Sequence, residues 1–193
     1  MPCCKTNISN KASGDKFFAS EFNELNQAVN NNADEVESRL GALESVSPAY
    51  VKLRSAASQD ANGIADLAIE WDVQEIEPVN ITHSTGGQNS TITIQSDGVY
   101  SFSGAINYYG TTGNYRLTTR VSFMVNGVTL PSYFDGSYIR ASSGSFNSAV
   151  NFSILLDLNA GDTVQILSKR LSTVTGNGVT TDGTTLSVFK LPW

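Results

Sequence analysis

The strict alternation of apolar and polar residues between Ala149 and Ser168 constrains the fold of this chain more than any other feature. Apolar side chains occupy every second position from Val150 to Leu158, which is the pattern of a strand with one buried face. Asn159–Asp162 has the composition of a turn, because glycine accepts positive φ and Asx side chains bond the nearby backbone. Alternation resumes over Thr163–Ile166, so the stretch predicts a hairpin. A sheet with one apolar face needs a second layer, and we therefore expect antiparallel β-structure around it.

The chain after Pro48 has the same β-type patterning throughout. Thr91–Gln95 and Val99–Gly104 indicate another hairpin, and Asn126-Gly127 is the strongest two-residue hairpin signal. Further predicted strands are Tyr50–Leu53, Ala65–Trp71, Leu117–Val125, Val128–Leu130 and Thr185–Phe189. Many short strands without an intervening helical pattern predict a mainly β, antiparallel sandwich or jelly roll over residues 48–193.

Residues 20–47 have helical periodicity instead. Ser20 suits the N-cap position, with Glu21 and Glu24 in the first turn. Apolar residues then recur at alternating spacings of three and four, which is the heptad seam of a coiled coil. The alternative is a helix that packs on its own domain, although such a helix usually has a broader apolar face. The predicted oligomerisation residues are Phe22, Leu25, Val29, Asn32, Val36 and Leu43.

Residues within the seam leave the number of associated helices open. Asn32 and Arg39 fall at core positions, where a polar residue fixes register but lowers stability. Val29 and Val36, paired with Leu25, favour two helices by the usual preference. The proline at position 48 disfavours a helical residue before it, so we place the domain boundary there.

Charge and composition exclude several classes of function. Residues 1–77 contain six Lys/Arg and thirteen Asp/Glu, whereas the rest of the chain contains six Lys/Arg and five Asp/Glu. Neither part therefore offers the basic patch that nucleic-acid binding requires. The sequence has no apolar segment suited to a signal peptide or membrane span, so we expect cytosolic synthesis and no membrane insertion. The only cysteines, Cys3 and Cys4, are adjacent, which excludes a disulfide framework and matches no usual zinc spacing.

No catalytic constellation is recognisable in the sequence. His83 is the only histidine, so a His-dependent triad or metal cluster lacks a second member, and we expect this residue in a loop. The GxSxG, P-loop and HExxH motifs are absent, and no spacing singles out a pair of carboxylates. We therefore predict a protein that is not an enzyme and that binds neither a cofactor nor a metal.

Two stretches, residues 108–115 (YYGTTGNY) and 131–138 (PSYFDGSY), combine aromatic rings with glycine and small polar residues. This mixture gives planar apolar platforms with adaptable hydrogen-bonding groups, which suits sugars. The alternative is that Tyr108, Tyr115, Phe134 and Tyr138 pack against strands or across a trimer interface. The predicted ligand-binding residues are Tyr108, Tyr109, Tyr115, Tyr133, Phe134 and Tyr138.

Four segments taken together resemble the globular domain shared by complement component one-q and tumour necrosis factor. They are GVYSFSGAI (98–106), RVSFMVNGVTL (120–130), SSGSFNSAVNFSILLDLNAGDTVQI (142–166) and TTLSVFKL (184–191), and they follow in the family's order. The residues that match the family patterns are Gly98, Tyr100, Phe102, Asn126, Gly127, Leu156, Leu158, Gly161, Asp162, Val164 and Phe189. The resemblance covers about residues 50–193 and implies a ten-strand jelly roll that assembles as a homotrimer.

A second resemblance lies in front of this domain. The segment SGDKFFASEFNELNQAVNNNADEVESRL (13–40) is similar to the start of many bacteriophage fibre proteins, in which a short anchor and a coiled coil precede a trimeric head. The resemblance implies that residues 1–19 are a flexible segment that docks on other virion proteins. The residues that would make this contact are Cys3, Cys4, Ile8, Phe17 and Phe18.

These observations lead to three functional hypotheses. The first is a virion protein, a trimeric phage fibre or capsid decoration, with a docking segment (1–19), a coiled coil (20–47) and a jelly-roll head (48–193) that attaches to host surface glycans. The second is a purely structural protein that stabilises the capsid or neck. The third is a soluble trimeric ligand of the complement one-q or tumour necrosis factor type. The missing export signal favours the first hypothesis over the third.

Overall fold

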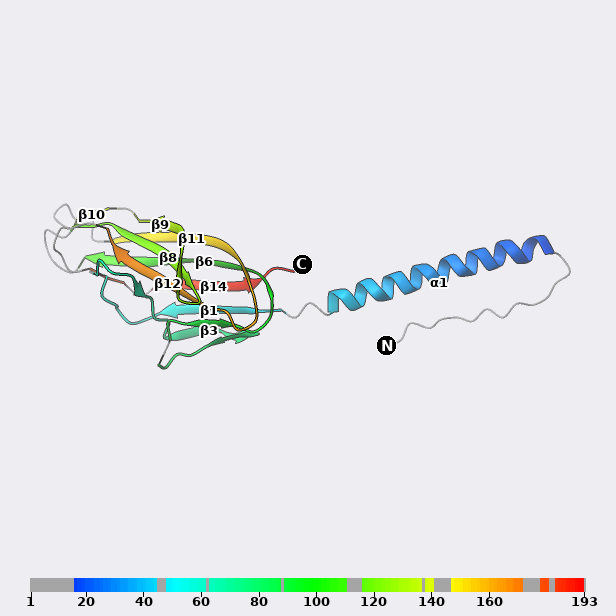
Figure 1. The fold of residues 1–193 in the computed structure, drawn as a ribbon, viewed down its shortest axis with the longest axis horizontal. Coiled ribbons are helices and arrows are strands. Elements are labelled where there is room, and N and C mark those ends of the chain that lie inside the picture. Colours follow the sequence, from blue (N-terminus) through cyan, green and yellow to red (C-terminus); the bar gives the residue numbers. More distant parts are fainter. Residues whose placement is uncertain are drawn as a thin grey trace. The chain divides into compact units, whose positions relative to one another are not determined.

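The structure is a computed structural model of the chain. It describes residues 16–44, 48–61, 63–87, 89–110, 116–136, 138–140, 147–171, 178–180 and 183–192. The chain divides into two compact units, Met1–Ser47 and Pro48–Trp193. Figure 1 shows helix α1 in the first unit and the strands in the second. We call them unit 1 and unit 2 and describe each by itself.

Unit 1 contains helix α1, Lys16–Glu44, which is 29 residues long. The prediction placed the helix at residues 20–47, so its start was wrong by four residues, and Ser20, the expected N-cap, lies inside α1. Lys16–Ala19 contains neither glycine nor proline, so local propensity allows the helix to extend back over this segment. Four residues of the segment predicted to be flexible are therefore helical.

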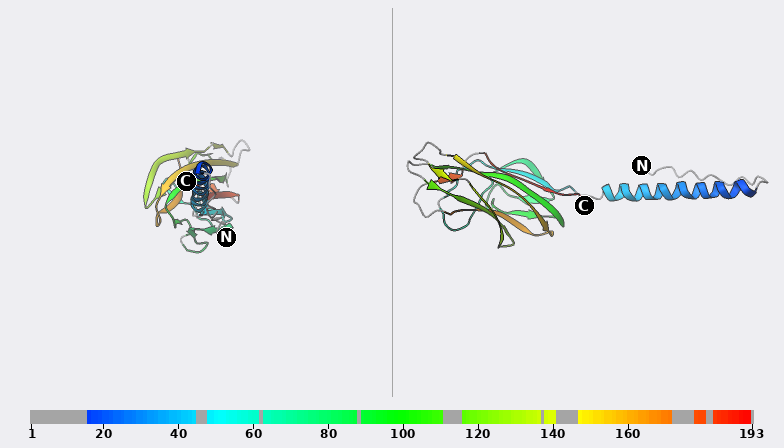
Figure 2. Two further views of the ribbon diagram at one scale, coloured as in Figure 1. Left: turned by 90° about the vertical axis from the view of Figure 1, so that its right-hand side faces the viewer. Right: turned by 90° about the horizontal axis from the view of Figure 1, so that it is seen from above.

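Unit 2 is a sandwich of two antiparallel sheets, and their layers can be followed in Figures 1 and 2. In sheet A the strand order is β11-β6-β14-β1-β3, and β13 also pairs with β6. In sheet B the strand order is β4-β5-β12-β8-β9, and β2 also pairs with β12. β7 and β10 form a separate pair. The strands of sheet A are β1 (Tyr50–Ser55), β3 (Val73–Val79), β6 (Gly98–Gly110), β11 (Asn147–Leu158), β13 (Gly178–Thr180) and β14 (Thr184–Lys190). Those of sheet B are β2 (Leu67–Ala68), β4 (Ile81–His83), β5 (Ile92–Ile94), β8 (Thr119–Val125), β9 (Val128–Asp135) and β12 (Thr163–Arg170). The remaining pair consists of β7 (Arg116–Leu117) and β10 (Ile139–Arg140).

The predicted mainly β, antiparallel sandwich is confirmed, and so is the hairpin at Asn126-Gly127. This dipeptide joins β8 to β9, which pair antiparallel with Val125 opposite Val128. Both turn residues have positive φ, 50° at Asn126 and 79° at Gly127. Positive φ at both central residues is the geometry that a two-residue turn needs to match the twist of its strands.

The two other predicted hairpins are wrong. The chain leaves β11 at Leu158 and enters β12 at Thr163, but β11 pairs with β6 in sheet A, whereas β12 pairs with β8, β5 and β2 in sheet B. The segment before β6 behaves in the same way, since β5 belongs to sheet B. Alternation determines which face of a strand is apolar, and two such faces are buried equally well when their strands lie in opposite sheets. Asn159–Asp162 is thus a turn that carries the chain from one layer to the other.

The core lies between the inner faces of the two sheets. Its largest fully buried side chains include Trp71, Tyr100 and Phe102. Phe123 of sheet B meets two rings of sheet A edge to face, with ring centroids 6.0 Å from Phe102 and 5.5 Å from Phe152. Trp71 lies outside any strand, because the strand predicted over residues 65–71 is limited to β2, Leu67–Ala68.

Candidate ligand pocket and assembly surfaces

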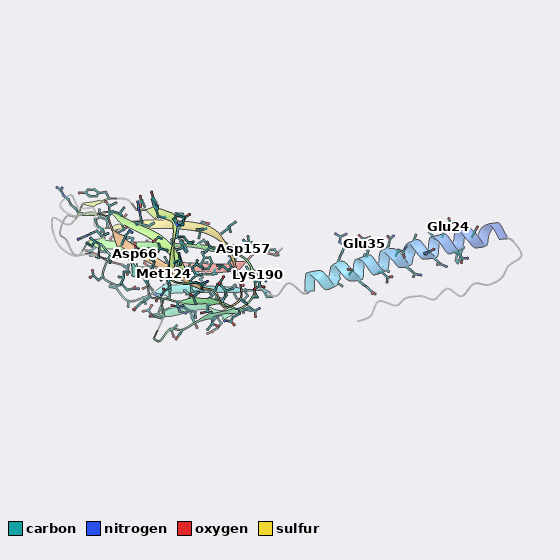
Figure 3. All side chains as sticks on the ribbon, viewed as in Figure 1. Glu24, Glu35, Asp66, Met124, Asp157 and Lys190 are labelled. Atoms are coloured by element: carbon teal, nitrogen blue, oxygen red, sulfur yellow. The ribbon has the colours of Figure 1, made fainter. Side chains whose placement is uncertain are left out.

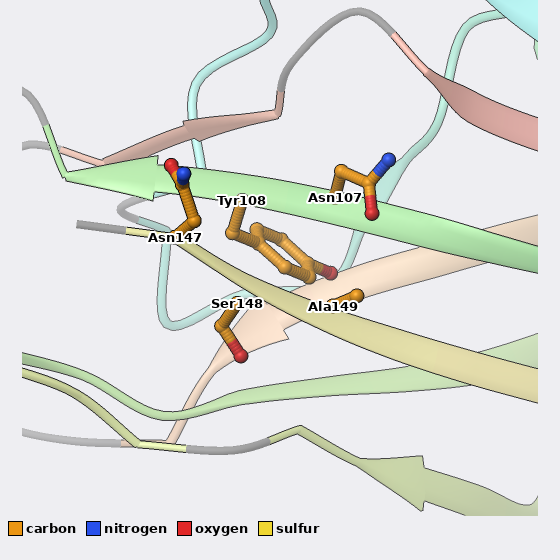
Figure 4. Close-up of a pocket in the computed structure, with 5 residues that line it drawn as sticks. All are labelled: Asn107, Tyr108, Asn147, Ser148 and Ala149. Atoms are coloured by element: carbon orange, nitrogen blue, oxygen red, sulfur yellow. The ribbon is translucent and has the colours of Figure 1, made fainter. Parts of the chain in front are cut away.

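A pocket of about 570 Å³ opens where β6 ends and β11 begins, and five described residues line it: Asn107, Tyr108, Asn147, Ser148 and Ala149 (Figure 4). The strands pair with Ala149 opposite Asn107 and with Asn147 opposite Tyr109. Successive side chains on a strand point to opposite faces. Because Tyr108 points into the core, Asn107 and Asn147 share the outer face of sheet A, and Figure 4 shows them on the same side of the two strands.

The pocket lies at the end of unit 2 that is remote from the unit's own termini. Tyr50, at the start of β1, pairs with Phe189 near the end of β14, and Lys190 pairs with Tyr100 at the start of β6. Asn107 lies seven residues further along β6, which corresponds to about 23 Å of extended strand. A ligand in this pocket would therefore be held at the end of the sandwich opposite the point where the chain enters and leaves it.

Tyr108 forms part of both the core and the pocket wall. The side chain is 1% exposed, and its hydroxyl lies 2.7 Å from Oγ of Ser168 on β12. Burial raises the pKa of Tyr108 to about 12, and the hydrogen bond to Ser168 opposes this shift. The hydroxyl therefore stays protonated at physiological pH and links sheet A to sheet B.

Phe134 is also a core side chain. Its ring centroid lies 6.3 Å from that of Phe123 and 6.3 Å from that of Phe152, and it packs against the hydrophobic core. Phe134 thus matches the packing alternative that the sequence left open, and it offers no exposed platform to a ligand.

The other predicted aromatic residues do not form one platform. Tyr109 on β6 is 40% exposed and lies beside the pocket, directly opposite Asn147. Tyr133 on β9 is exposed in the other sheet, and the Arg120 guanidinium covers its ring at 3.5 Å from the centroid. Tyr138 is exposed just before β10, and Tyr115 lies outside the described residues.

Arg120 is itself fixed by Asp135. Its Nε and Nη2 donate to the two carboxylate oxygens at 2.7 and 3.0 Å. These bonds, opposed by partial desolvation, lower the pKa of the Asp135 carboxyl. Tyr133, Arg120 and Asp135 therefore form one exposed cluster across β8 and β9, separate from the pocket.

His83 lies in strand β4 and is 8% exposed, so its predicted place in a loop was wrong. Its Nε2 lies 2.8 Å from the Asn89 carbonyl oxygen, and its Nδ1 lies 3.3 Å from Nε2 of Gln74. Because a carbonyl can only accept, Nε2 carries the proton and Nδ1 accepts from the Gln74 amide. Desolvation lowers the pKa of His83, although the bond to Asn89 opposes the shift. A hollow of about 110 Å³ adjoins this histidine.

The outer face of sheet A carries a row of exposed apolar side chains near the termini of unit 2. Leu155 on β11 lies opposite Ser101 on β6, Ser101 lies opposite Phe189 on β14, and Phe189 lies opposite Tyr50 on β1. Leu155, Phe189 and Tyr50, which we call the apolar row, are 58%, 43% and 41% exposed. Ser153 and Asp157, each two residues from Leu155 on the same face of β11, are polar and exposed, and Figure 3 labels Asp157.

Serine side chains follow the apolar row along the same face. Ser153, Ser103 and Ser187 are mutually opposite on β11, β6 and β14. Small side chains on the central strands leave the face flat and allow another surface to approach closely. Together with the apolar row they form a surface that we call the A face.

The predicted seam of α1 is exposed in the single chain. Phe22, Leu25, Val29 and Val36 are all exposed, and Asn32 shares their stripe. Figure 3 labels two acidic side chains of the helix, Glu24 and Glu35. The side chains of Phe17, Phe18 and Leu43 lie outside the described set, as do residues Cys3, Cys4 and Ile8.

The described part of the chain lacks two further features. No helix there is long and apolar enough to cross a membrane. Nowhere in that part do three or more His, Cys, Asp or Glu side chains gather in a way that could hold a metal ion.

Comparisons with known proteins support the fold that the geometry describes. No protein-family model matches the sequence, and no curated protein matches it significantly. Among solved structures, murine APRIL at pH 5.0 is 13% identical with a TM-score of 0.52, and the match covers 75% of this chain and 99% of that one. The globular domain of zebrafish complement 1qA is 14% identical with a TM-score of 0.50, over 75% of this chain and 98% of that one. Unit 2 therefore has the jelly-roll fold of tumour necrosis factor-like and complement one-q-like domains.

Proposed function

We propose that this chain is a subunit of a homotrimeric binding protein of the tumour necrosis factor and complement one-q type, in which three copies of unit 2 assemble through the A face. The observation that carries the proposal is the apolar row, three large apolar side chains that lie in register across β11, β14 and β1 and are exposed in the single chain. An exposed apolar patch with a polar rim is typical of a protein–protein interface. The likeness of fold to murine APRIL and zebrafish complement 1qA supports this ligand-type hypothesis more than the others.

Threefold symmetry determines what the A face would contact. In a closed ring of three, each interface is heterologous, so the A face of one subunit meets a different surface of the next. The serines beside the apolar row favour such a contact because they allow the neighbouring surface to approach the backbone of the central strands. Binding, and not catalysis, is the activity that the proposal assigns to the trimer.

Sedimentation of full-length variants tests this assembly. Leu155→Glu places a charge in the apolar row without disturbing the core, because Leu155 is exposed. We expect three chains for the wild type and one chain for Leu155→Glu, with the circular dichroism of unit 2 unchanged. Val128→Glu is the matched control, since Val128 is also an exposed aliphatic residue, on β9 of the other sheet, at the turn. A monomeric wild type, or a Leu155→Glu variant that remains trimeric, would contradict the proposal.

A second candidate function is a virion fibre or capsid decoration subunit, which the exposed stripe of α1 favours. A helix with a two-per-heptad apolar stripe is suited to join copies of itself in front of a head domain. The resemblance of residues 13–40 to phage fibre proteins supports the same arrangement, with residues 1–19 as the segment that docks on other virion proteins. In this case the trimeric head would attach to bacterial surface glycans.

Deletion of residues 1–15 tests the docking part of this second function. We expect the shortened chain to keep the oligomeric state of the full chain but no longer to co-sediment with particles produced without the wild-type protein. Normal incorporation into particles would place the anchor elsewhere, and failure of the full chain to enter any particle would rule the virion function out.

A further inference from the structure

The pocket at the end of β6 and β11 has a wall chemistry that selects a class of ligand. Two amide side chains, Asn107 and Asn147, project on the same face, and Ala149, directly opposite Asn107, completes this part of the wall. Each amide offers a carbonyl acceptor and two N–H donors. A ligand hydroxyl also donates and accepts, so a pair of amides on one face suits neighbouring hydroxyl groups.

The described part of the wall offers no counter-charge to a charged ligand. None of the described residues that line the pocket carries a charge at neutral pH, and the raised pKa of Tyr108 keeps its hydroxyl neutral. A carboxylate, phosphate or ammonium group placed there would lose hydration without gaining a counter-charge, which is unfavourable. The polar groups of the wall therefore match an uncharged partner.

An aromatic ring stands beside the amides. Tyr109 lies directly opposite Asn147 and is 40% exposed. A ring next to hydrogen-bonding side chains provides an apolar surface for the C–H face of a ligand and polar contacts for its edge. The pocket volume of about 570 Å³ falls within the usual range for small-molecule sites, about 300 to 1,000 Å³.

We propose that this pocket binds a neutral saccharide, with Asn107 and Asn147 bonding vicinal hydroxyls and Tyr109 stacking on the ring. The inference deepens the proposed function, because a trimer would present three such sites at the ends of its jelly-roll units. Asn147 precedes Leu155 of the apolar row by eight residues, about 26 Å along β11, so the proposed assembly leaves the pocket accessible. Several weak sites on one assembly raise the avidity for a surface that repeats the sugar.

Nuclear magnetic resonance of the full chain with defined sugars tests the site. The probes are glucose, galactose, mannose, N-acetylglucosamine and rhamnose, with N-acetylneuraminic acid and glucuronic acid as charged comparisons. We expect at least one neutral sugar to give saturation-transfer signals and to shift the side-chain amide resonances of Asn107 and Asn147. We expect the two acidic sugars to give neither effect. Absence of binding by every neutral sugar, or equal binding of the acidic ones, would overturn the proposal.

Substitution of the amides by leucine, which has nearly the same shape, identifies the contacts. Asn107→Leu and Asn147→Leu should each weaken binding of the neutral sugar by about fivefold or more, the effect of one lost hydrogen bond. Asn151→Leu is the matched control, because Asn151 is an exposed asparagine on the same strand and the same face as Asn147, outside the pocket wall. An equal loss in Asn151→Leu would overturn the assignment, and if a variant fails to fold, the amide shifts of the wild type decide the question.

Sedimentation of the same samples separates this inference from the proposed function. A trimer that binds none of the neutral sugars would overturn the pocket proposal alone. A monomer whose Asn107 and Asn147 amides respond to a neutral sugar would overturn the trimer alone.

Discussion

At the scale of single residues, two buried polar side chains connect the layers of the sandwich. The Tyr108 hydroxyl on β6 of sheet A bonds Ser168 on β12 of sheet B at 2.7 Å. His83 on β4 of sheet B accepts from Gln74 on β3 of sheet A, and its other nitrogen donates to Asn89. Hydrophobic packing between sheets has no direction, whereas these bonds require one relative position of the layers. Both side chains are therefore expected to affect stability and its dependence on pH.

Replacement of Tyr108 by phenylalanine should lower the free energy of unfolding by about 1 kcal/mol, because a buried hydroxyl bond is lost and Ser168 keeps a buried polar atom without this partner. The raised pKa of Tyr108 also stabilises the wild type below pH 10, and this contribution is lost as the pH rises towards 12. Urea denaturation at pH 7 and in alkali measures both effects. Tyr138→Phe, at an exposed tyrosine, is the control and should change neither value.

Protonation of His83 should destabilise the fold below neutral pH. Its pKa is lowered in the folded state, mainly by desolvation, so the unfolded chain binds a proton first as the pH falls below about 6.5. The stability that neutral His83 contributes is therefore full above that pH and decreases as the pH falls towards the folded-state pKa. Because the chain has one histidine, the slope of unfolding free energy between pH 7 and 5.5 reports on this residue. A His83→Gln variant with the same slope would contradict the assignment.

At the scale of elements, the hairpin β8–β9 shows how local backbone conformation determines a register. Asn126 and Gly127 reverse the chain between β8 and β9. The Asn126 side chain also bonds the segment that connects β11 to β12: its Nδ2 donates to Asp162 at 2.7 Å, and its Oδ1 accepts from the Thr163 N–H at 2.9 Å. One turn residue thus connects the β8–β9 hairpin to the turn between β11 and β12. The element depends on a positive φ that glycine adopts without strain.

Gly127→Ala should therefore destabilise unit 2 by about 1 to 2 kcal/mol, the usual cost of a left-handed conformation for a residue with a Cβ. A Cβ at this position meets nothing within 4 Å, so the loss would come from the backbone conformation alone. Gly87→Ala is the matched control, because a Cβ there also has open space and the φ of Gly87 lies outside the range that disfavours side chains. Because neither variant creates a steric collision, the difference between their melting temperatures measures the conformational strain at Gly127. Equal melting temperatures would show that the turn tolerates alanine.

At the scale of the whole molecule, the division into two units has a consequence for assembly. Unit 2 has a core of its own, and the described part of unit 1 is helix α1, whose apolar stripe is interrupted by Asn32 and Arg39. Most of a helix's stability in a protein comes from packing of its apolar face, and polar residues at seam positions weaken a coiled coil. We therefore expect the A face to contribute more to assembly than α1.

Residues 48–193 alone should remain trimeric and should unfold at nearly the temperature of the full chain. In both proteins the melting temperature should rise with protein concentration, because association stabilises only the folded state. Light scattering and calorimetry at several concentrations check this expectation. If the fragment is monomeric while the full chain is trimeric, α1 holds the assembly and the A face does not.

Sequence alone predicted those features that depend on neighbouring residues. The alternation from Val150 to Leu158 identified one apolar face of β11, and Asn126-Gly127 identified a turn with positive φ, because both signals reside in local backbone geometry. The same reasoning found the helix but misplaced its start, since helix ends depend on small differences in propensity that several residues share.

Tertiary structure decided everything that depends on which strands lie side by side. The alternation along a strand shows which side chains are buried, but it does not show which strand lies beside it. β11 and β12 were therefore predicted to form one hairpin, although they lie in opposite sheets. For the same reason no sequence pattern indicated that Asn107 and Asn147, forty residues apart, share a pocket wall, or that His83 is buried between Gln74 and Asn89. Pairing is determined by backbone hydrogen bonds and core packing over the whole of unit 2, and these long-range contacts leave no periodic signal in any single segment.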